Sequence, residues 1–357
     1  MNPTFWRGRR VLVTGHTGFK GSWLALWLHE AGATVAGYSL PPATLESLYQ
    51  LADVGTAVDS TFADIRDVAE LQRQFDRFQP EIVFHLAAQA LVRRSYDAPV
   101  ETYAVNVMGT VNLLEAVRKC PSCRVVVVVT SDKCYENRES NWGYRECDPM
   151  GGHDPYSSSK GCAEIVTAAY RRSFFQPSSQ QPVAIATARA GNVIGGGDFS
   201  KDRLVPDLVN AMLQHSVLTI RFPDAVRPWQ HVLEPLSGYI LLAERLWTSP
   251  QKYSESWNFG PSAQDCRPVR WIIEKLNELS DERVEWVVER SSKPHEAGLL
   301  TLDSTKARTL LGWHSRWPVE TALRSAIDWY KAYRRHDRVR DTVIRDIENY
   351  ESTPVGH

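Results

Sequence analysis

The sequence lacks any long apolar run, and none of its stretches reaches the roughly 18 residues that a membrane-spanning helix needs. It also lacks an excess of charge of either sign, since 41 basic residues face 42 acidic ones. A near-neutral chain gives no reason to expect a nucleic acid or an anionic membrane as partner. The first ten residues are too few and too charged for a signal peptide, so we expect a cytoplasmic protein.

Cysteine is scarce as well, with six residues in 357, which argues against a disulfide framework. Cys120 and Cys123 form a CxxC pair, but no second pair follows at the spacing of a zinc site. We interpret them as structural thiols and expect no metal. A redox or metal role for the pair is the alternative.

What the sequence does contain is a glycine turn between a short apolar strand, residues 10–14, and an amphipathic stretch, residues 22–31. Strand, glycine turn and helix in this order form the first unit of a dinucleotide-binding fold. The spacing is GxxGxxG instead of GxGxxG, and a purely structural turn is the alternative. The candidate cofactor-binding residues of the turn are Gly15, His16, Thr17, Gly18, Phe19, Lys20 and Gly21.

The predicted second strand, residues 34–38, ends without the acidic residue that usually binds the ribose of NAD. It also lacks the arginine of an NADP site, so the choice between NAD and NADP stays open; Ser39 is the polar residue at this point. After the third strand, Asp64 and Ile65 are candidates for the adenine side of the site. Asp67 fits equally well as an N-cap for the helix that follows.

The fourth predicted strand leads into residues that let the backbone pass close to a cofactor: Leu86, Ala87, Ala88 and Gln89. Helices are expected over residues 99–119, with Asn106 inside an apolar pattern. A buried asparagine in a helix usually has a structural hydrogen-bonding role, which we expect here besides a place near the cofactor.

Residues 125–129 are five consecutive valines, which predict a strand buried on both faces of a parallel sheet. The strand runs into Ser131, Asp132 and Lys133. Because ligands of open α/β sheets bind at the carboxyl ends of the strands, an acid and a base are expected side by side at the site.

Tyr156 and Lys160 are four residues apart and therefore share one face of a predicted helix. A nearby ammonium favours the phenolate, so we expect a lowered tyrosine pKa. A surface pair without a role is the alternative for this YxxxK motif.

Beyond strand six, the glycine-rich segment 190–198 is expected to wall a pocket. Basic residues suited to phosphate contacts follow at Lys201, Arg203, Arg221 and Arg227, although each alone is typical of a solvated surface. We predict an α/β fold: a Rossmann-like, doubly wound parallel sheet with a smaller C-terminal α/β substrate lobe. The expected domains are 1–190 with returning segments near 227–260, a discontinuous lobe 191–340, and a mobile tail 341–357.

With these motifs in register, the chain resembles the extended short-chain dehydrogenase/reductases (the NAD-dependent epimerase/dehydratase family) over nearly its whole length. Members that act on nucleotide sugars share the segments 85–89, 189–192 and 227–229 of this sequence. The dTDP- and GDP-sugar dehydratases carry an Asp-Glu or similar acidic pair where this chain has Asp132 and Lys133. That departure favours the CDP-sugar branch.

The resemblance implies NAD as cofactor and a lyase reaction on a nucleotide sugar. Tyr156, assisted by Lys160 and Ser131, would take the proton of the sugar 4-hydroxyl while hydride leaves C4 for NAD. Asp132 would be the acid and Lys133 the base of water loss. The implied substrate-binding residues are Gln89, Ser131, Asn192, Arg203 and Arg227. The cofactor site would also include Tyr156, Lys160, Asn106 and the segments named above. A homodimer or homotetramer paired through helices 99–119 and 156–172 is implied too.

Two other functions remain open. A nucleotide-sugar 4-epimerase or reductase would share Tyr156 and Lys160 but has no use for an acid and base after strand five. A non-catalytic dinucleotide sensor could dispense with Tyr156 and Lys160 altogether.

Overall fold

The computed structural model describes residues 1–355 except 177–181, 201, 281 and 290–296. Within them, a single parallel sheet is formed by seven strands: β1 (Arg10–Thr14), β2 (Thr34–Ser39), β3 (Asp59–Phe62), β4 (Ile82–His85), β5 (Val125–Val129), β6 (Ala184–Ala190) and β11 (Ser256–Phe259). Their order is β11-β6-β5-β4-β1-β2-β3, and every neighbouring pair is parallel. The predicted doubly wound sheet is thereby confirmed.

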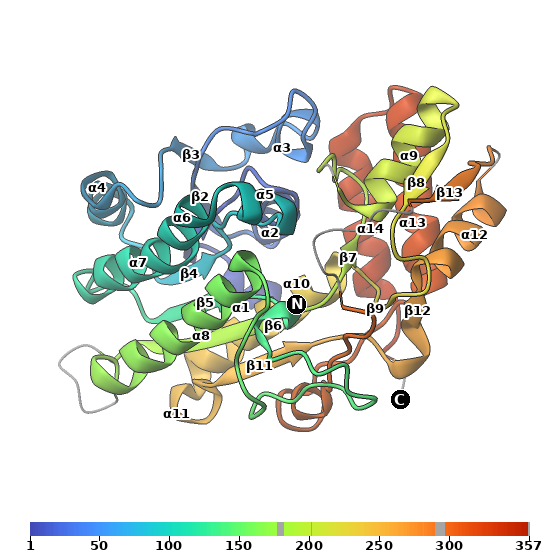
Figure 1. Ribbon diagram of the computed structural model, residues 1–357. Coiled ribbons are helices and arrows are strands. Elements are labelled where there is room, and N and C mark those ends of the chain that lie inside the picture. Colours follow the sequence, from blue (N-terminus) through green and yellow to red (C-terminus); the bar gives the residue numbers. More distant parts are fainter. Residues whose placement is uncertain (177–181, 201, 281, 290–296, 356–357) are drawn as a thin grey trace.

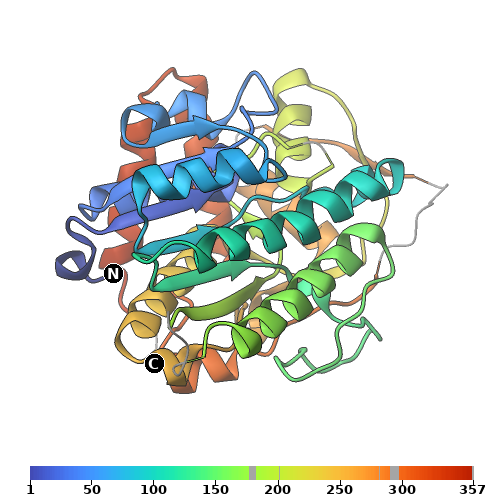
Figure 2. The ribbon, with the colours of Figure 1, turned by 90° about the vertical axis from the view of Figure 1, so that its left-hand side faces the viewer.

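Helices cover both faces of this sheet, as Figures 1 and 2 show. One face carries α4 (Val68–Phe78), α6 (Pro99–Tyr103), α7 (Gly109–Arg118) and α8 (Pro155–Ser173); the other carries α2 (Phe19–Glu30) and α10 (Leu233–Thr248). The valines of β5 alternate between two core clusters: Val125, Val127 and Val129 point into one, Val126 and Val128 into the other. A five-valine strand is stable here because neither face meets water.

A second lobe lies beyond the carboxyl ends of the strands, on the right of Figure 1. Its longer elements are α9 (Leu204–Gln214), α12 (Val269–Leu279), α13 (Val319–Arg334) and α14 (Val339–Ser352). Its short strands pair as β7 (Val193–Ile194) with β10 (Gln230–His231), β8 (Leu218–Ile220) with β13 (Trp286–Val288), and β9 (Val226–Pro228) with β12 (Cys266–Pro268).

The shorter α-helices are α1 (Pro3–Trp6), α3 (Leu48–Leu51), α5 (Val92–Asp97) and α11 (Pro250–Tyr253), and a widened helical turn at Ala104–Met108 joins α6 to α7. Further single helical turns lie at Val54–Thr56, Asp132–Cys134, Ala263–Asp265 and Ala307–Leu311. None of the described helices is long and apolar enough to cross a membrane.

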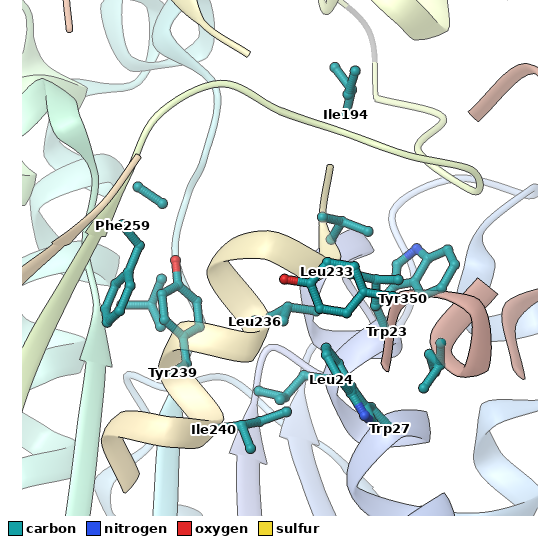
Figure 3. Packing of buried hydrophobic residues seen from close by; sticks show 14 of the residues in the cluster. Trp23, Leu24, Trp27, Ile194, Leu233, Leu236, Tyr239, Ile240, Phe259 and Tyr350 are labelled. Carbon is teal, nitrogen blue, oxygen red and sulfur yellow. The ribbon is translucent and has the colours of Figure 1, made fainter. Parts of the chain in front are cut away.

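The expectation of a mobile tail beyond about Asp341 is wrong, because this segment forms α14. Val343, Ile347 and Tyr350 are buried on one face of the helix. Figure 3 shows Tyr350 beside Trp23 and Trp27 of α2, and its ring lies edge-on to Trp27 with centroids 5.7 Å apart. The Tyr350 hydroxyl donates a hydrogen bond of 2.8 Å to Glu234 at the start of α10, so the helix is part of the core.

A buried ion pair fixes α8 against the sheet. Glu164 of α8 and Arg189 of β6 are each 3% exposed, and two hydrogen bonds of 2.8 and 2.7 Å join them. The same carboxylate accepts bonds from Thr130, at the end of β5, and from Thr187 of β6. Burial raises the pKa of Glu164, but the bonds from Arg189 outweigh it and hold the pKa below its usual value.

We predict that Glu164→Ala lowers the free energy of unfolding by about 3–5 kcal/mol, because Arg189 would be left buried without its partner. Urea unfolding monitored by circular dichroism measures this. The control is Glu101→Ala, which breaks an ion pair with Arg94 whose side chains are 36% and 56% exposed. That loss should stay within about 1 kcal/mol. Equal effects of the two substitutions would contradict the anchoring role of Glu164.

For α14 we predict that Ile347→Ala costs about 2–5 kcal/mol of unfolding free energy, since it removes a buried side chain from a packed core. The exposed neighbour Glu348 is the matched control, and Glu348→Ala should change stability by no more than about 0.5 kcal/mol. A neutral Ile347→Ala would mean that the C-terminal segment does not pack on the core.

Candidate active site

A cavity of about 510 Å³ lies at the carboxyl ends of β5 and β6 and extends into the second lobe; it is called the main cavity below. One end is walled by the residues after β5 and by the first turn of α8. The segment 190–195 forms a side wall, as predicted for this glycine-rich stretch. The other end is formed by α9 and β8.

Ser131, Asp132 and Lys133 all line the main cavity. Ser131 leaves the strand in extended conformation, and its hydroxyl accepts the Lys133 N–H at 3.2 Å, which caps a single helical turn. The same hydroxyl donates to Asp132 Oδ1 at 3.0 Å. This local capping aims the carboxyl of Asp132 and the amine of Lys133 into one space.

Asp132 is 2% exposed, and its Oδ2 is buried with no hydrogen-bond partner in the described structure. Burial raises the pKa of this carboxyl, while the positive charges of Lys133, Arg227 and Lys20 partly oppose the shift. A raised pKa favours the protonated form, which an acid catalyst requires. The orphaned oxygen is the atom from which a proton could reach a bound molecule.

Tyr156 and Lys160 lie on one face of α8, as their spacing predicts, and are 8% and 7% exposed. Ser131 is near enough to the Tyr156 hydroxyl to oppose the effect of burial on its pKa, and Lys160 Nζ donates to the carbonyl of Val129 at 3.4 Å. The expected lowering of the tyrosine pKa is wrong for the protein alone: burial raises the pKa of Tyr156 to about 12. Burial also lowers the pKa of Lys160 to about 8, so the charge of Lys160 stabilises the Tyr156 phenolate only to a limited extent.

Lys20 lies in the first turn of α2 and lines the main cavity, although the glycine motif alone suggested only the cofactor turn. It forms no ion pair or hydrogen bond with any residue that the structure describes. Burial, followed by the charge of Arg203, lowers its pKa to about 8. Its charge acts on Asp132 as well, so Lys20 is electrostatically coupled to the residues that follow β5.

The glycine turn has the geometry of a phosphate cradle. Gly15 has φ +75°, and a Cβ there would meet Ala87 N at 2.8 Å. A Cβ on Gly21 would lie 2.0 Å from the Gly15 carbonyl oxygen. Gly18 is the N-cap of α2 and offers no side chain to the first-turn N–H groups, which therefore point toward the loop. These features fit the pyrophosphate of a dinucleotide.

The remaining residues of the turn have local roles. Phe19 begins α2 and is partly buried in the core. The Thr17 hydroxyl donates to the carbonyl of Leu40 at 2.9 Å, which ties the turn to the end of β2. The ring of His16 is fully buried against Gly37, and its Nε2 lies 3.0 Å from the Ser60 hydroxyl. Burial lowers the His16 pKa to about 4, so the ring is neutral.

The segment after β4 is held close to the glycine turn. The N–H groups of Leu86 and Ala87 both donate to Thr14 Oγ1 at 3.2 Å, and Ala88 follows them. Asn106 bonds to both backbone groups of Gln89, at 2.8 and 3.0 Å, and its Nδ2 also donates to Ser159. The structural role predicted for Asn106 is confirmed.

Asp64 does not stand free at the adenine side, because both of its carboxylate oxygens accept from Arg66. Ile65 is buried against Gly109 of α7. Asp67 is the N-cap of α4 and accepts the Glu70 N–H at 3.0 Å, which confirms that alternative.

The predicted substrate residues Asn192, Arg203 and Arg227 all line the main cavity, whereas Gln89 lies behind it and donates to Thr102. Arg203 is paired with Asp198 at 2.8 Å. Arg227 donates to the carbonyls of Val226 and Ala297, at 2.9 and 2.5 Å. Lys201 lies outside the described residues.

The two cysteines of the CxxC pair are buried free thiols. Within the described ranges, no three His, Cys, Asp or Glu side chains gather as a metal site would require.

The sequence patterns did not predict that Glu164 is the buried partner of Arg189, or that Lys20 lines the main cavity. Glu164 stands four residues after Lys160, on the face of the helix that also carries Tyr156, and that periodicity was the available signal. No sequence pattern indicates that the Lys20 side chain lines the main cavity, because this depends on how α2 is placed relative to the second lobe.

Comparison with known proteins agrees with this site. Over 354 residues the chain is 51% identical to a CDP-glucose 4,6-dehydratase of Salmonella typhimurium strain LT2, and the match covers 99% of both proteins. Among solved structures, a UDP-glucose 4-epimerase of Thermotoga maritima superposes with a TM-score of 0.77 at 22% identity, covering 91% of this chain and 99% of the other.

A dTDP-glucose 4,6-dehydratase of Bacillus anthracis, solved with NAD, superposes with a TM-score of 0.76 at 21% identity, covering 92% of this chain and 99% of that one. At such identities the superpositions establish the fold. The family model of the GDP-mannose 4,6 dehydratases matches residues 12–326. With that match and the 51% identical relative, the chain belongs to this dehydratase family of short-chain dehydrogenase/reductase type.

Proposed function

We propose that this protein is an NAD-dependent CDP-glucose 4,6-dehydratase, a hydro-lyase. The observation that carries the proposal is the acid-base pair Asp132 and Lys133 in the same buried cavity as Tyr156. A 4-epimerase or a reductase needs the tyrosine for a C4 oxidation or reduction but has no leaving group to protonate. The pair therefore favours a dehydratase over these alternatives, and over a non-catalytic dinucleotide sensor.

The first step is oxidation at C4 of the glucose unit. Tyr156, as phenolate, takes the proton of the 4-hydroxyl, and Ser131, which lies near the tyrosine hydroxyl, holds the two oxygens in line. NAD, when bound, supplies the hydride acceptor for C4 and the hydride donor for C6. Because burial alone disfavours the phenolate, its formation requires further positive charge near Tyr156 when the cavity is filled.

The second step is loss of water across C5 and C6. The 4-keto group makes the C5 proton acidic, and Lys133, as neutral amine, removes it. Asp132 gives its proton to the departing 6-hydroxyl, which leaves as water, and the raised pKa of this carboxyl suits that role. With hydride at C6, the ammonium of Lys133 gives a proton to C5. Because the ammonium protons exchange with water between the two transfers, this hydrogen comes from solvent.

The residues proposed to hold NAD are those of the glycine turn, Gly15 to Gly21, together with the segment Leu86 to Gln89 and the face of α8 that carries Tyr156 and Lys160. Asp64, Ile65 and Asn106 would shape the adenine and ribose sides. In this proposal residues 1–190 with the returning segment 227–260 bind the dinucleotide, and residues 191–340 bind the nucleotide sugar.

The substrate is proposed to lie with glucose at Asp132 and with its diphosphate near Arg227 and Arg203, while Asn192 contacts the sugar. The choice of a CDP-sugar draws on the 51% identical relative. Further proposals are a role in deoxysugar synthesis for the O-antigen of lipopolysaccharide, a cytoplasmic location and a homodimer or homotetramer. The apolar side chains of Val100, Met108 and Ile165, which are 81%, 51% and 60% exposed on the helices 99–119 and 156–172, support such pairing.

We predict that the purified protein, given CDP-glucose in deuterated water, forms a 4-keto-6-deoxy product with deuterium at C5. Nuclear magnetic resonance of the product measures the label. A product inverted at C4 and retaining its 6-hydroxyl would identify an epimerase. No conversion of CDP-glucose at all would overturn the proposed function.

We predict that Lys133→Ala lowers turnover about 10²–10⁴-fold by removing the base of the second step, while oxidation at C4 remains. Absorbance at the wavelength of the reduced nicotinamide should therefore rise and persist, and C5 should stop exchanging with deuterated water. The control is Lys252→Ala, at an exposed lysine of α11. Normal C5 exchange in Lys133→Ala would show that another group is the base.

A further inference from the structure

The main cavity has two ends of different character. The catalytic end carries Asp132, Lys133 and Tyr156. The far end is formed by the first turn of α9 and by β8 with the residues after it, in the part of Figure 1 that lies away from α8. Its walls include apolar side chains that suit a flat ring: Pro206, Leu218, Ile220, Phe222 and Val269.

One carboxylate stands among these apolar walls. Asp207, in the first turn of α9, lines the cavity and is partly buried. Among the described residues it has no ion-pair partner. Burial, followed by the negative charge of Asp202, raises its pKa to about 6. The backbone of Asp202 gives this carboxylate one hydrogen bond. A desolvated carboxylate without a cation is stabilised further when a second hydrogen-bond donor reaches it.

The neighbouring carboxylates are already satisfied. Asp198 is paired with Arg203 at 2.8 Å, and Asp202 is paired with Arg93 at 3.0 Å. Arg221 also approaches Asp202, at 3.9 Å. Arg203, Arg93 and Arg221 are therefore engaged by other carboxylates, whereas Asp207 faces the cavity.

Asp207 lies one helical turn beyond Arg203 on α9, where its N–H donates to the Arg203 carbonyl at 2.9 Å. Arg203 and Arg227 line the same cavity as Tyr156 and Asp132, and their charges act on Tyr156 and Asp132 respectively. A molecule with its sugar at Asp132 and its diphosphate at the arginines would extend its nucleobase toward Asp207.

We propose that Asp207 recognises the cytosine base by accepting a hydrogen bond from its exocyclic amino group. The inference rests on the proposed function and names the residue that selects the nucleotide. Cytosine presents a donor at C4, which aspartate and glutamate accept in base recognition. Uracil and thymine present a carbonyl oxygen there, and two acceptors facing each other repel, so the same carboxylate also rejects these bases.

An acidic residue in the first turn of a helix can instead have a purely structural role, because its negative charge stabilises the positive end of the helix dipole. Such a role would affect all nucleotides equally. The test therefore compares ligands that differ in one group of the base: CDP, UDP, and a CDP analogue that lacks the 4-amino group.

Binding of the three diphosphates to the full-length protein is measured by calorimetry for wild type, Asp207→Ala and Asp207→Asn. Wild type should bind CDP about 10- to 100-fold more tightly than either the analogue or UDP, the discrimination typical of a good base contact. In Asp207→Ala the ratio of CDP to the analogue should fall to about 1. Asp207→Asn, which offers a donor as well, should bind UDP more tightly than wild type does.

The control is Asp224→Asn, at a carboxylate that is 78% exposed and paired with Arg270. It should leave all three affinities unchanged. If Asp207→Ala weakens CDP and the analogue by the same factor, or changes neither, Asp207 does not read the base and the inference is wrong. Conversion of CDP-glucose to the 4-keto-6-deoxy product by wild type separates this failure from that of the proposed function, which falls if that product does not form.

Discussion

The buried pair of Glu164 and Arg189 is the contact on which the site depends. Glu164 receives hydrogen bonds from the end of β5 through Thr130 and from β6 through Thr187 and Arg189. The carboxylate therefore fixes α8 to both strands at once. Ser131 follows Thr130 directly, and Tyr156 lies two helical turns before Glu164. The ion pair therefore fixes the position of Ser131 relative to Tyr156 in the candidate active site. Breaking a pair so deeply buried leaves a charge without compensation.

Charge in a partly enclosed cavity is the second constraint. The described lining of the main cavity places six lysine and arginine side chains with Asp132: Lys20, Arg93, Lys133, Arg203, Arg221 and Arg227. Burial lowers the pKa values of Lys20 and Lys160 to about 8 and raises that of Asp132, so each of these groups is less readily charged than in water. A carboxyl held in its protonated form can give the proton that the proposed loss of water requires.

Local patterns in the sequence predicted much of this protein. The glycine turn, the five-valine strand and the i, i+4 pair on α8 depend on residues close in the chain, and each lies where its pattern indicated. Three features could not be read this way. The direction of Lys20 and the pKa of Tyr156 follow from burial between distant segments. The packing of α14 rests on apolar residues whose partners include Trp27 of α2, more than 300 positions away in the sequence.

We propose that one cavity performs oxidation, loss of water and reduction on the same bound sugar. The decisive experiment uses CDP-glucose that carries deuterium at C4, mixed with unlabelled CDP-glucose, and follows the product by mass spectrometry and nuclear magnetic resonance. The deuterium should move to C6 of the same molecule, with none transferred to unlabelled molecules. Deuterium that remains at C4, or is lost to solvent, would show that hydride is not transferred within one bound sugar.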